Sequence, residues 1–129
     1  MRVQMWRRLV AGSLLAITLL TAACGGSNEE PAEVPTGEVS FKKHVQPILL
    51  RNCVGCHGGS AGLWLDRYET VMEGTPRAPV IIPGDPDASE LYLRITGQKQ
   101  PAMPIGGRKL RPEQIETIRL WIAQGAKDN

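Results

Sequence analysis

The chain has 129 residues, and its 15 Lys and Arg nearly balance 13 Asp and Glu, which leaves a net charge of +2. This length suits one domain once any targeting segment is removed. The small net charge excludes the strongly basic signature of a nucleic-acid-binding protein. An apolar content of 42% is ordinary for a globular chain.

Residues 1–23 are typical of an export signal. Three arginines precede an uncharged run that ends at Ala23, and this run is too short for a comfortable membrane span but suits a signal peptide. The following Cys24 completes a motif that resembles the lipobox of bacterial lipoproteins, although Thr21 stands where Leu, Val or Ile is usual. We expect Cys24 to be lipidated as the new N-terminus. There are two alternatives. The signal is cleaved in the ordinary way and Cys24 keeps a free thiol, or the segment is not cleaved and remains as an anchor.

All three outcomes place the protein outside the cytoplasm, in the periplasm or on the outer face of a bacterial membrane. Residues 24–39 then predict a flexible acidic tether, because 25–39 hold four glutamates, two prolines and three glycines without any periodic apolar pattern. The folded domain is expected over residues 40–129, where 12 basic and 9 acidic side chains leave a net charge of +3.

Helical patterns recur after Ser40, and no strand-like alternation of useful length interrupts them. Ser40 is a candidate cap for a first helix, with a kink or a new start at Pro47. The apolar positions of this helix fall on one face: Phe41, Val45, Ile48 and Leu49.

Three further helices are predicted by their start and stop signals. Asp66 followed by Glu69 indicates a capping box, and Gly74 ends that helix. Asp85-Pro86 indicates a cap with proline at the first helical position, and the helix runs to Gly97. The last helix opens at Pro112, ends at Gly125 and has an apolar stripe made of Ile115, Ile118, Trp121 and Ile122.

Long loops rich in glycine and proline join these four short helices. A domain of about 90 residues is already marginal on surface-to-volume grounds. We therefore expect the loops to pack around a large apolar cofactor.

The segment Cys53-Val54-Gly55-Cys56-His57 has the spacing of c-type haem attachment. Its two thiols can add to the two haem vinyl groups, and His57 is then held under the iron as the proximal ligand. A structural zinc site would need four ligands, and only the distant His44 could complete the set. A dithiol redox centre would prefer a βαβ setting, which the sequence does not predict. Covalent haem is the favoured interpretation.

A haem iron needs a second axial ligand or a reason for an open position. His44 lies on the helix that leads into the motif, so it is not expected to reach the opposite haem face. Met72 lies within a predicted helix, where packing is the simpler role. Met103 lies between Pro101 and Pro104, 46 residues after His57, and the prolines restrict the backbone around it. Met103 is the predicted distal ligand.

Five segments, in order, resemble the planctomycete-type cytochrome c domain, a branch of the class I c-type cytochromes: FKKHVQPILLRNCVGCHG, GLWLDRYETVMEG, VIIPGDPDASELYLRITG, PAMPIGG and LRPEQIETIRLWIAQGA. The resemblance implies an all-α fold wrapped around one covalent haem c, with its first and last helices crossing beside the haem. It also implies His57 and Met103 as axial ligands and electron transfer as the role. One departure is Arg111, which stands before Pro112 where the family often has a serine or aspartate cap.

The sequence thus predicts a membrane-tethered carrier of single electrons rather than an enzyme, with transient redox proteins as partners and no small-molecule substrate. A basic rim that steers an acidic partner is one interpretation of the positive residues around Met103, and a merely solvated loop is the other: Lys99, Arg108, Lys109 and Arg111. An open-haem sensor or peroxidase-like enzyme is the alternative function. It would require displacement of Met103 and a distal acid, base or hydrogen-bond donor, for which His44 is the only histidine candidate.

Overall fold

A computed structural model describes residues 33–129, apart from the side chain of Ala61. These residues contain helices and no β-strand, with one isolated bridge between Gly58 and Trp64. The elements are the π-helical turn η1 (Phe41–Val45), α1 (Gln46–Asn52), the 3₁₀ turn η2 (Ser60–Gly62), α2 (Tyr68–Glu73), α3 (Glu90–Ile95) and α4 (Pro112–Ala123). The prediction of an all-α fold with four short helices and long loops is confirmed.

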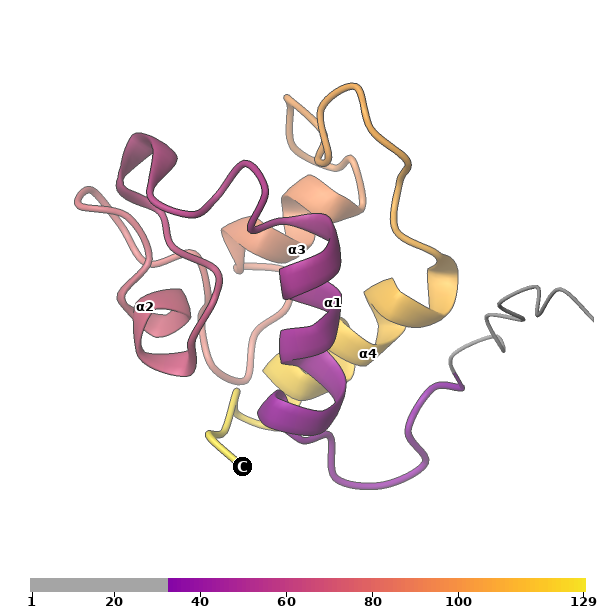
Figure 1. The fold of residues 1–129 in the computed structure, drawn as a ribbon. Coiled ribbons are helices and arrows are strands. Elements are labelled where there is room, and N and C mark those ends of the chain that lie inside the picture. The colour runs from indigo at the N-terminus through magenta and orange to yellow at the C-terminus, as the bar shows by residue number, and fades with distance from the viewer. Residues whose placement is uncertain (1–32) are drawn as a thin grey trace, which may run out of the picture.

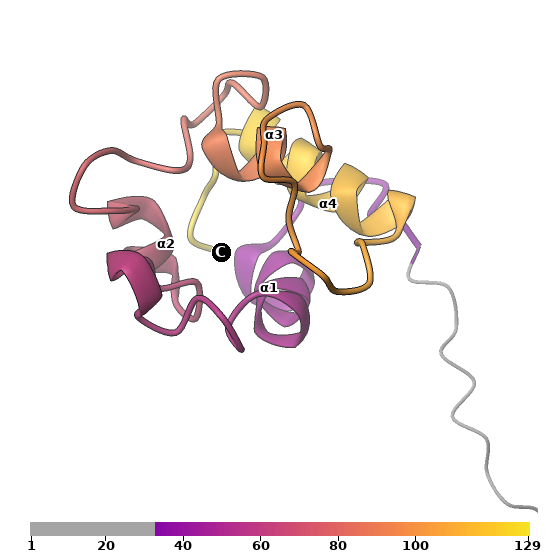
Figure 2. The same cartoon turned by 90° about the horizontal axis from the view of Figure 1, so that it is seen from above.

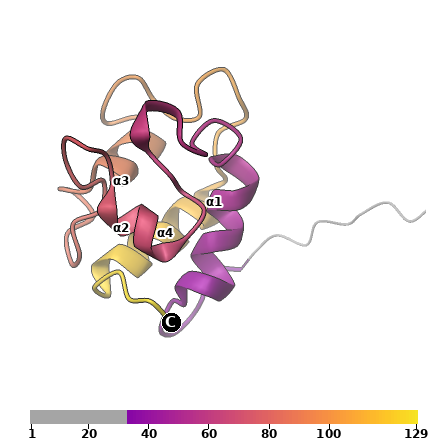
Figure 3. The same cartoon turned by 60° about the vertical axis from the view of Figure 1, so that its left-hand side comes forward.

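The first and last helical segments cross each other, and α3 packs against α4 (Figure 1). The helix α2 lies at one end of the domain, away from α4 (Figures 1 and 2). Loops between α2, α3 and α4 form much of the outline of the molecule (Figure 3). None of the helices in residues 33–129 is long and apolar enough to span a membrane.

The first helix forms as its sequence predicts. The Ser40 hydroxyl accepts a hydrogen bond from the Lys43 N–H at 3.2 Å, and the apolar face, including Phe41 and Val45, is buried. Of the two effects predicted for Pro47, a kink or a new start, the structure has the new start, because η1 ends at Val45 and α1 has Pro47 in its first turn.

The starts of α2 and α3 differ from the predicted ones. Asp66 does not cap α2, which begins after Arg67 without a side-chain cap; the Asp66 carboxylate instead accepts from the Thr70 hydroxyl at 3.1 Å. The helix after Asp85 starts four residues later than Pro86, at Glu90.

The delayed start of α3 has a physical cause at Ser89. Asp85 does cap a single turn, since its carboxylate accepts from the Ala88 N–H at 3.0 Å. The turn does not propagate, because the buried Ser89 hydroxyl accepts from the Ile82 N–H at 2.8 Å and donates to the Asp85 carbonyl at 2.8 Å. Ser89 is thereby held against the preceding loop, and the helix begins only after it.

The helix ends agree with the predictions. Gly74 caps α2 with a φ of 73°, and Gly125 follows α4 with a φ of 97°. At the start of α4 the missing serine or aspartate cap is replaced from within the helix, since the Gln114 side chain accepts from the Arg111 N–H at 2.9 Å.

An aromatic cluster fills the crossing of η1 and α4. The Phe41 ring lies 5.3 Å from the Trp121 ring and 5.4 Å, edge to face, from the Tyr68 ring. The Trp121 indole donates to the Lys127 carbonyl at 3.0 Å, and the Tyr68 hydroxyl donates to the Ala126 carbonyl at 2.9 Å. The polar ends of both rings are therefore satisfied while their apolar parts are packed.

The chain is held to this core before Ser40. Gln124 accepts from the Val39 N–H at 2.7 Å and donates to the Gly37 carbonyl at 3.1 Å, and the Val39 side chain is buried. Gly37 and Val39, which belong to the segment assigned to the tether, thus contact the end of α4.

Candidate cofactor site

Cys53, Cys56 and His57 of the motif share one turn at the end of α1. The His57 and Cys56 N–H groups both donate to the Cys53 carbonyl, at 2.8 and 3.1 Å, and the Cys53 N–H donates to the Leu49 carbonyl at 2.8 Å. The turn is thus a tight continuation of the helix. All three side chains line one cavity of about 410 Å³.

The backbone of His57 is held by the chain that follows it. The Leu65 N–H donates to the His57 carbonyl at 3.0 Å, and the Gly59 N–H donates to the Leu63 carbonyl at 3.1 Å. This loop leaves Leu63 and Leu65 facing an adjoining cavity of about 260 Å³, which His57 also lines.

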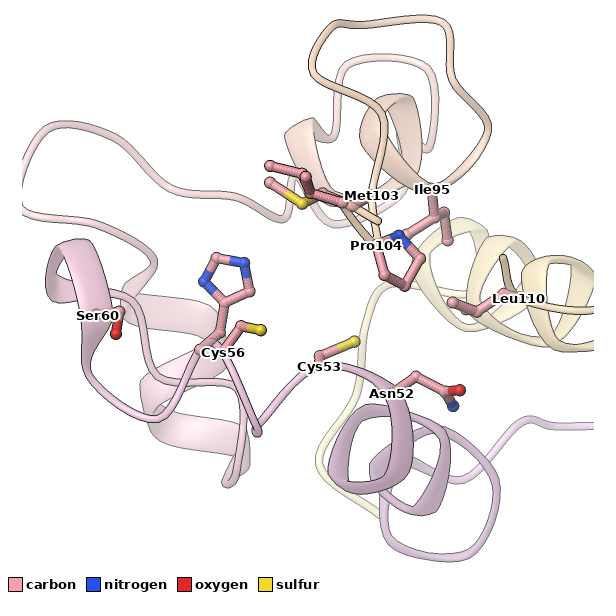
Figure 4. A pocket seen from close by; sticks show the side chains of 10 residues that line it. Asn52, Cys53, Cys56, Ser60, Ile95, Met103, Pro104 and Leu110 are labelled. Carbon is pink, nitrogen blue, oxygen red and sulfur yellow. The ribbon is translucent and has the colours of Figure 1, made fainter. Parts of the chain in front are cut away.

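Met103 lies on the wall opposite the cysteines (Figure 4). It comes from the loop between α3 and α4, and it lines both cavities together with Cys53, His57 and Ile95. The structure therefore brings together all four residues that the sequence predicts for the haem. Cys24, the predicted lipidation site, lies outside the described residues.

The two rejected candidates for the second ligand lie elsewhere. The His44 Nδ1 accepts from the Ser40 N–H at 2.9 Å, and the ring lines a separate small cavity beside Arg51. Met72 packs against the hydrophobic core and lines neither of the two main cavities.

The cavity walls fit a large apolar group with a metal at its centre. The larger volume lies within the range of cofactor sites, roughly 300–1,000 Å³, and the smaller cavity adjoins it. Seven of the lining side chains are aliphatic: Leu63, Leu65, Val80, Leu91, Ile95, Ile105 and Leu110. The His57 Nδ1 is buried and has no hydrogen-bond partner within residues 33–129. Such a nitrogen is costly when it is left unpaired, so an imidazole on this wall is suited to bind a metal inside the cavity.

The surroundings of Cys53 disfavour zinc binding and disulfide exchange. Burial raises the pKa of Cys53 to about 11, and the neighbouring Cys56 adds to the rise. A thiol that stays protonated near neutral pH is a poor thiolate ligand and a poor exchange nucleophile. No group of three His, Cys, Asp or Glu side chains within residues 33–129 is placed to hold a metal ion.

Charged residues around Met103 are paired to different degrees. Lys99 pairs with Glu90, and the Arg111 Nε lies 2.8 Å from the carboxylate of Glu113. Arg108 and Lys109 are exposed and form no ion pair within residues 33–129. Of the four cations in the possible basic rim, only Arg108 and Lys109 are therefore without an ion pair in this part of the chain.

Sequence reasoning missed Glu90 and Arg94, which line the smaller cavity with Met103. Their signal was present as an acid and a base four residues apart on one helix, the spacing at which such side chains pair. The spacing did not indicate that the pair faces the cavity. That orientation depends on where the loop after α3 folds back and places Met103.

Comparison with known proteins is consistent with this geometry. Residues 53–104 match the family described as Planctomycete cytochrome C. The match begins at the first cysteine of the turn and includes Met103. No curated protein and no solved structure matches the chain.

Proposed function

From the premise that residues 53–104 form a planctomycete-type cytochrome c domain, we propose that the protein is a carrier of single electrons with one covalent haem c. Cys53 and Cys56 form the two thioether links, and His57 and Met103 are the axial ligands. The observation that supports this most directly is the shared cavity, which Cys53, Cys56, His57 and Met103 all line, with Met103 opposite the cysteines (Figure 4).

Bound haem supplies an iron that accepts and releases one electron. His57 and Met103, which line the same cavity, would hold the iron through an imidazole and a thioether, and this ligand pair raises the reduction potential. The aliphatic walls exclude water and lower the local polarity. With both ligands supplied by side chains, a bound haem would have no free position for a substrate, so a carrier role is favoured over an enzymatic one.

An open-haem sensor or peroxidase-like enzyme is less well supported. It would need a polar group near the iron on the Met103 side. Arg94 and Glu90 are the charged residues of the smaller cavity, but Arg94 is bonded to Glu90 at 2.7 Å and to the Pro101 carbonyl at 3.2 Å. Neither is free to act on a ligand while these bonds persist.

Spectra of the haem-loaded protein and its Met103→Ala variant distinguish the two functions. We expect wild-type ferrous protein to bind carbon monoxide poorly and Met103→Ala to bind it readily, because the variant frees one axial position. Met72→Ala is the matched control and should keep the wild-type spectrum. Ready binding by wild type, with an unchanged spectrum in Met103→Ala, would show that Met103 is not the ligand.

Covalent attachment is tested by haem staining after denaturing electrophoresis. Wild type should keep the stain, while a variant with both Cys53→Ser and Cys56→Ser should lose it. A stained double variant would contradict attachment through these residues.

The exported, lipid-anchored state is a further part of the proposal. It is supported by the sequence of residues 1–24, and domains of this family are typically extracytoplasmic. Residues 24–39 would then increase the local concentration of the domain near membrane-bound redox partners. Mass analysis of the mature N-terminus tests it: a diacylglycerol modification on Cys24 supports the anchor, and a free Cys24 or an intact residue 1 contradicts it.

A small surface beside Met103 is proposed as the contact for acidic redox partners. Ile105 lines the cavity and is 67% exposed, and Arg108 and Lys109 follow it without ion-pair partners in the described part of the chain. Apolar contact with nearby positive charge suits a brief, electrostatically guided encounter.

Reaction with small oxidants of opposite charge tests this surface. A variant with Arg108→Gln and Lys109→Gln should reduce anionic ferricyanide more slowly at low salt than wild type, with little change toward a cationic cobalt complex. Arg77→Gln, at an exposed position on another loop, is the control. Equal slowing by both variants would argue against a localised docking surface.

A further inference from the structure

The loop that carries Met103 returns to α3 and is bonded to it along its length. The Lys99 N–H donates to the Leu93 carbonyl at 3.0 Å, and the Met103 N–H donates to the Arg94 carbonyl at 3.0 Å. Most side chains between these two points are exposed, among them Lys99, Gln100 and Pro101. Apolar burial therefore does little to hold this loop, and polar contacts decide its position.

The side chains of Glu90, Arg94 and Lys99 form the bonds that hold the loop to α3. The Arg94 Nε donates to one Glu90 oxygen at 2.7 Å, and the Arg94 Nη1 donates to the Pro101 carbonyl at 3.2 Å. The Lys99 ammonium donates to the other Glu90 oxygen. Glu90 thus joins a residue of the helix to a residue of the loop, and Arg94 contacts the loop two residues before Met103.

Within this cluster, the Arg94–Glu90 pair is better shielded than the Arg119–Glu116 pair of α4. The Arg94 and Glu90 side chains are 23% and 29% exposed, whereas Arg119 and Glu116 on α4 are 37% and 40% exposed. Partial burial strengthens charged contacts relative to those in open solvent. Glu90 and Arg94 also line the cavity that Met103 and His57 share.

We propose that Arg94, oriented by Glu90, is a positioning residue that holds Met103 against the haem iron. The inference rests on the proposed function, because it assumes that Met103 is the distal ligand. Binding of the Met103 thioether to the iron depends on how often the loop is in the competent position. Bonds from Arg94 to the loop raise that fraction without contact between Arg94 and the iron.

Competition by imidazole measures the effect in the haem-loaded ferric protein. Arg94→Gln loses these bonds, so the loop should spend less time in the position that brings Met103 to the iron. Imidazole should then bind about threefold to tenfold more tightly, a change typical for loss of a partly exposed charged contact. Glu90→Gln should tighten it by a smaller factor, because the Arg94 bond to Pro101 can persist. Arg94→Lys keeps the charge but not the two-pronged geometry, so it should lie between wild type and Arg94→Gln.

Arg119→Gln is the matched control. It removes an equally well-formed pair, since Arg119 bonds to both Glu116 oxygens at 2.7 Å, on a helix face outside the cavity. Its imidazole affinity should equal that of wild type. Amide exchange adds a second readout: the Met103 N–H should exchange faster in Arg94→Gln than in Arg119→Gln, while the amides of α4 in Arg94→Gln keep their wild-type rates.

The outcomes separate this inference from the proposed function. If Met103→Ala leaves imidazole affinity unchanged, Met103 is not the ligand and both proposals fail. If Met103→Ala tightens imidazole binding but Arg94→Gln and Glu90→Gln both match Arg119→Gln, the positioning role alone is overturned. Should Arg94→Gln not fold, Arg94→Lys and Glu90→Gln decide the question by the same comparison.

Discussion

At the scale of single residues, the backbone around His57 depends on one glycine. Gly59 has a φ of 113°, a conformation that side chains disfavour. A Cβ there would lie 2.5 Å from the Trp64 ring. The Trp64 ring covers this glycine even though Trp64 is 47% exposed. The backbone of Trp64 also forms a bridge with Gly58, and this bridge closes the loop that holds His57.

We expect Gly59→Ala to lower the free energy of unfolding by about 1–3 kcal/mol, because both the φ angle and the Trp64 contact become strained. Denaturant unfolding of the haem-loaded protein measures the loss. Gly37→Ala is the control, since Gly37 has neither a positive φ nor any atom within 4 Å of an added Cβ. Equal stability of the two variants would mean that the loop relaxes without cost.

At the scale of elements, the crossing of η1 and α4 fixes both ends of the domain together. Phe41 and Trp121 pack inside the crossing, and Gln124 bonds the segment at Gly37 and Val39 to the end of α4. The apolar stripe of α4 was readable from its sequence because helical spacing places those residues on one face. The role of Gln124 was not readable, since its partners lie 85 and 87 residues away.

Gln124→Ala should destabilise the domain by about 1–2 kcal/mol, because the Val39 N–H loses its partner in a partly buried setting. Thermal or denaturant unfolding provides the measurement. Gln98→Ala is the matched control, because the exposed Gln98 side chain makes no hydrogen bond within residues 33–129. The interpretation is wrong if both variants unfold at the same denaturant concentration.

At the scale of the whole molecule, two carboxylates couple stability to pH. Hydrogen bonding from Lys99, together with Arg94, holds the pKa of Glu90 below its ordinary value of 4.5, and Arg119 does the same for Glu116. A carboxyl whose pKa is lower in the folded state contributes stability above its unfolded pKa and loses it as the pH falls through the folded pKa. Both pairs are partly exposed, so solvent screens the effect.

The folded domain should therefore lose stability as the pH falls below about 4.5, the unfolded value. Glu90→Gln should flatten this dependence, since its amide does not titrate, and it should be less stable than wild type at neutral pH. Denaturant unfolding at pH 7, 5 and 3 checks both statements. A wild-type slope that persists in Glu90→Gln would exclude Glu90 as a source.

The sequence by itself determined the helical class, the haem-attachment spacing at Cys53, Cys56 and His57, and the choice of Met103 over Met72 and His44 as a candidate. These follow from local signals: residue spacing, prolines and apolar periodicity act over a few positions. Only the tertiary structure decided where α3 begins and which cations are free. It also decided that Glu90 and Arg94 face the Met103 loop. Those features depend on contacts such as Ser89 with Ile82 and Arg94 with Pro101, in which the meeting of separate segments overrides the local preference of each.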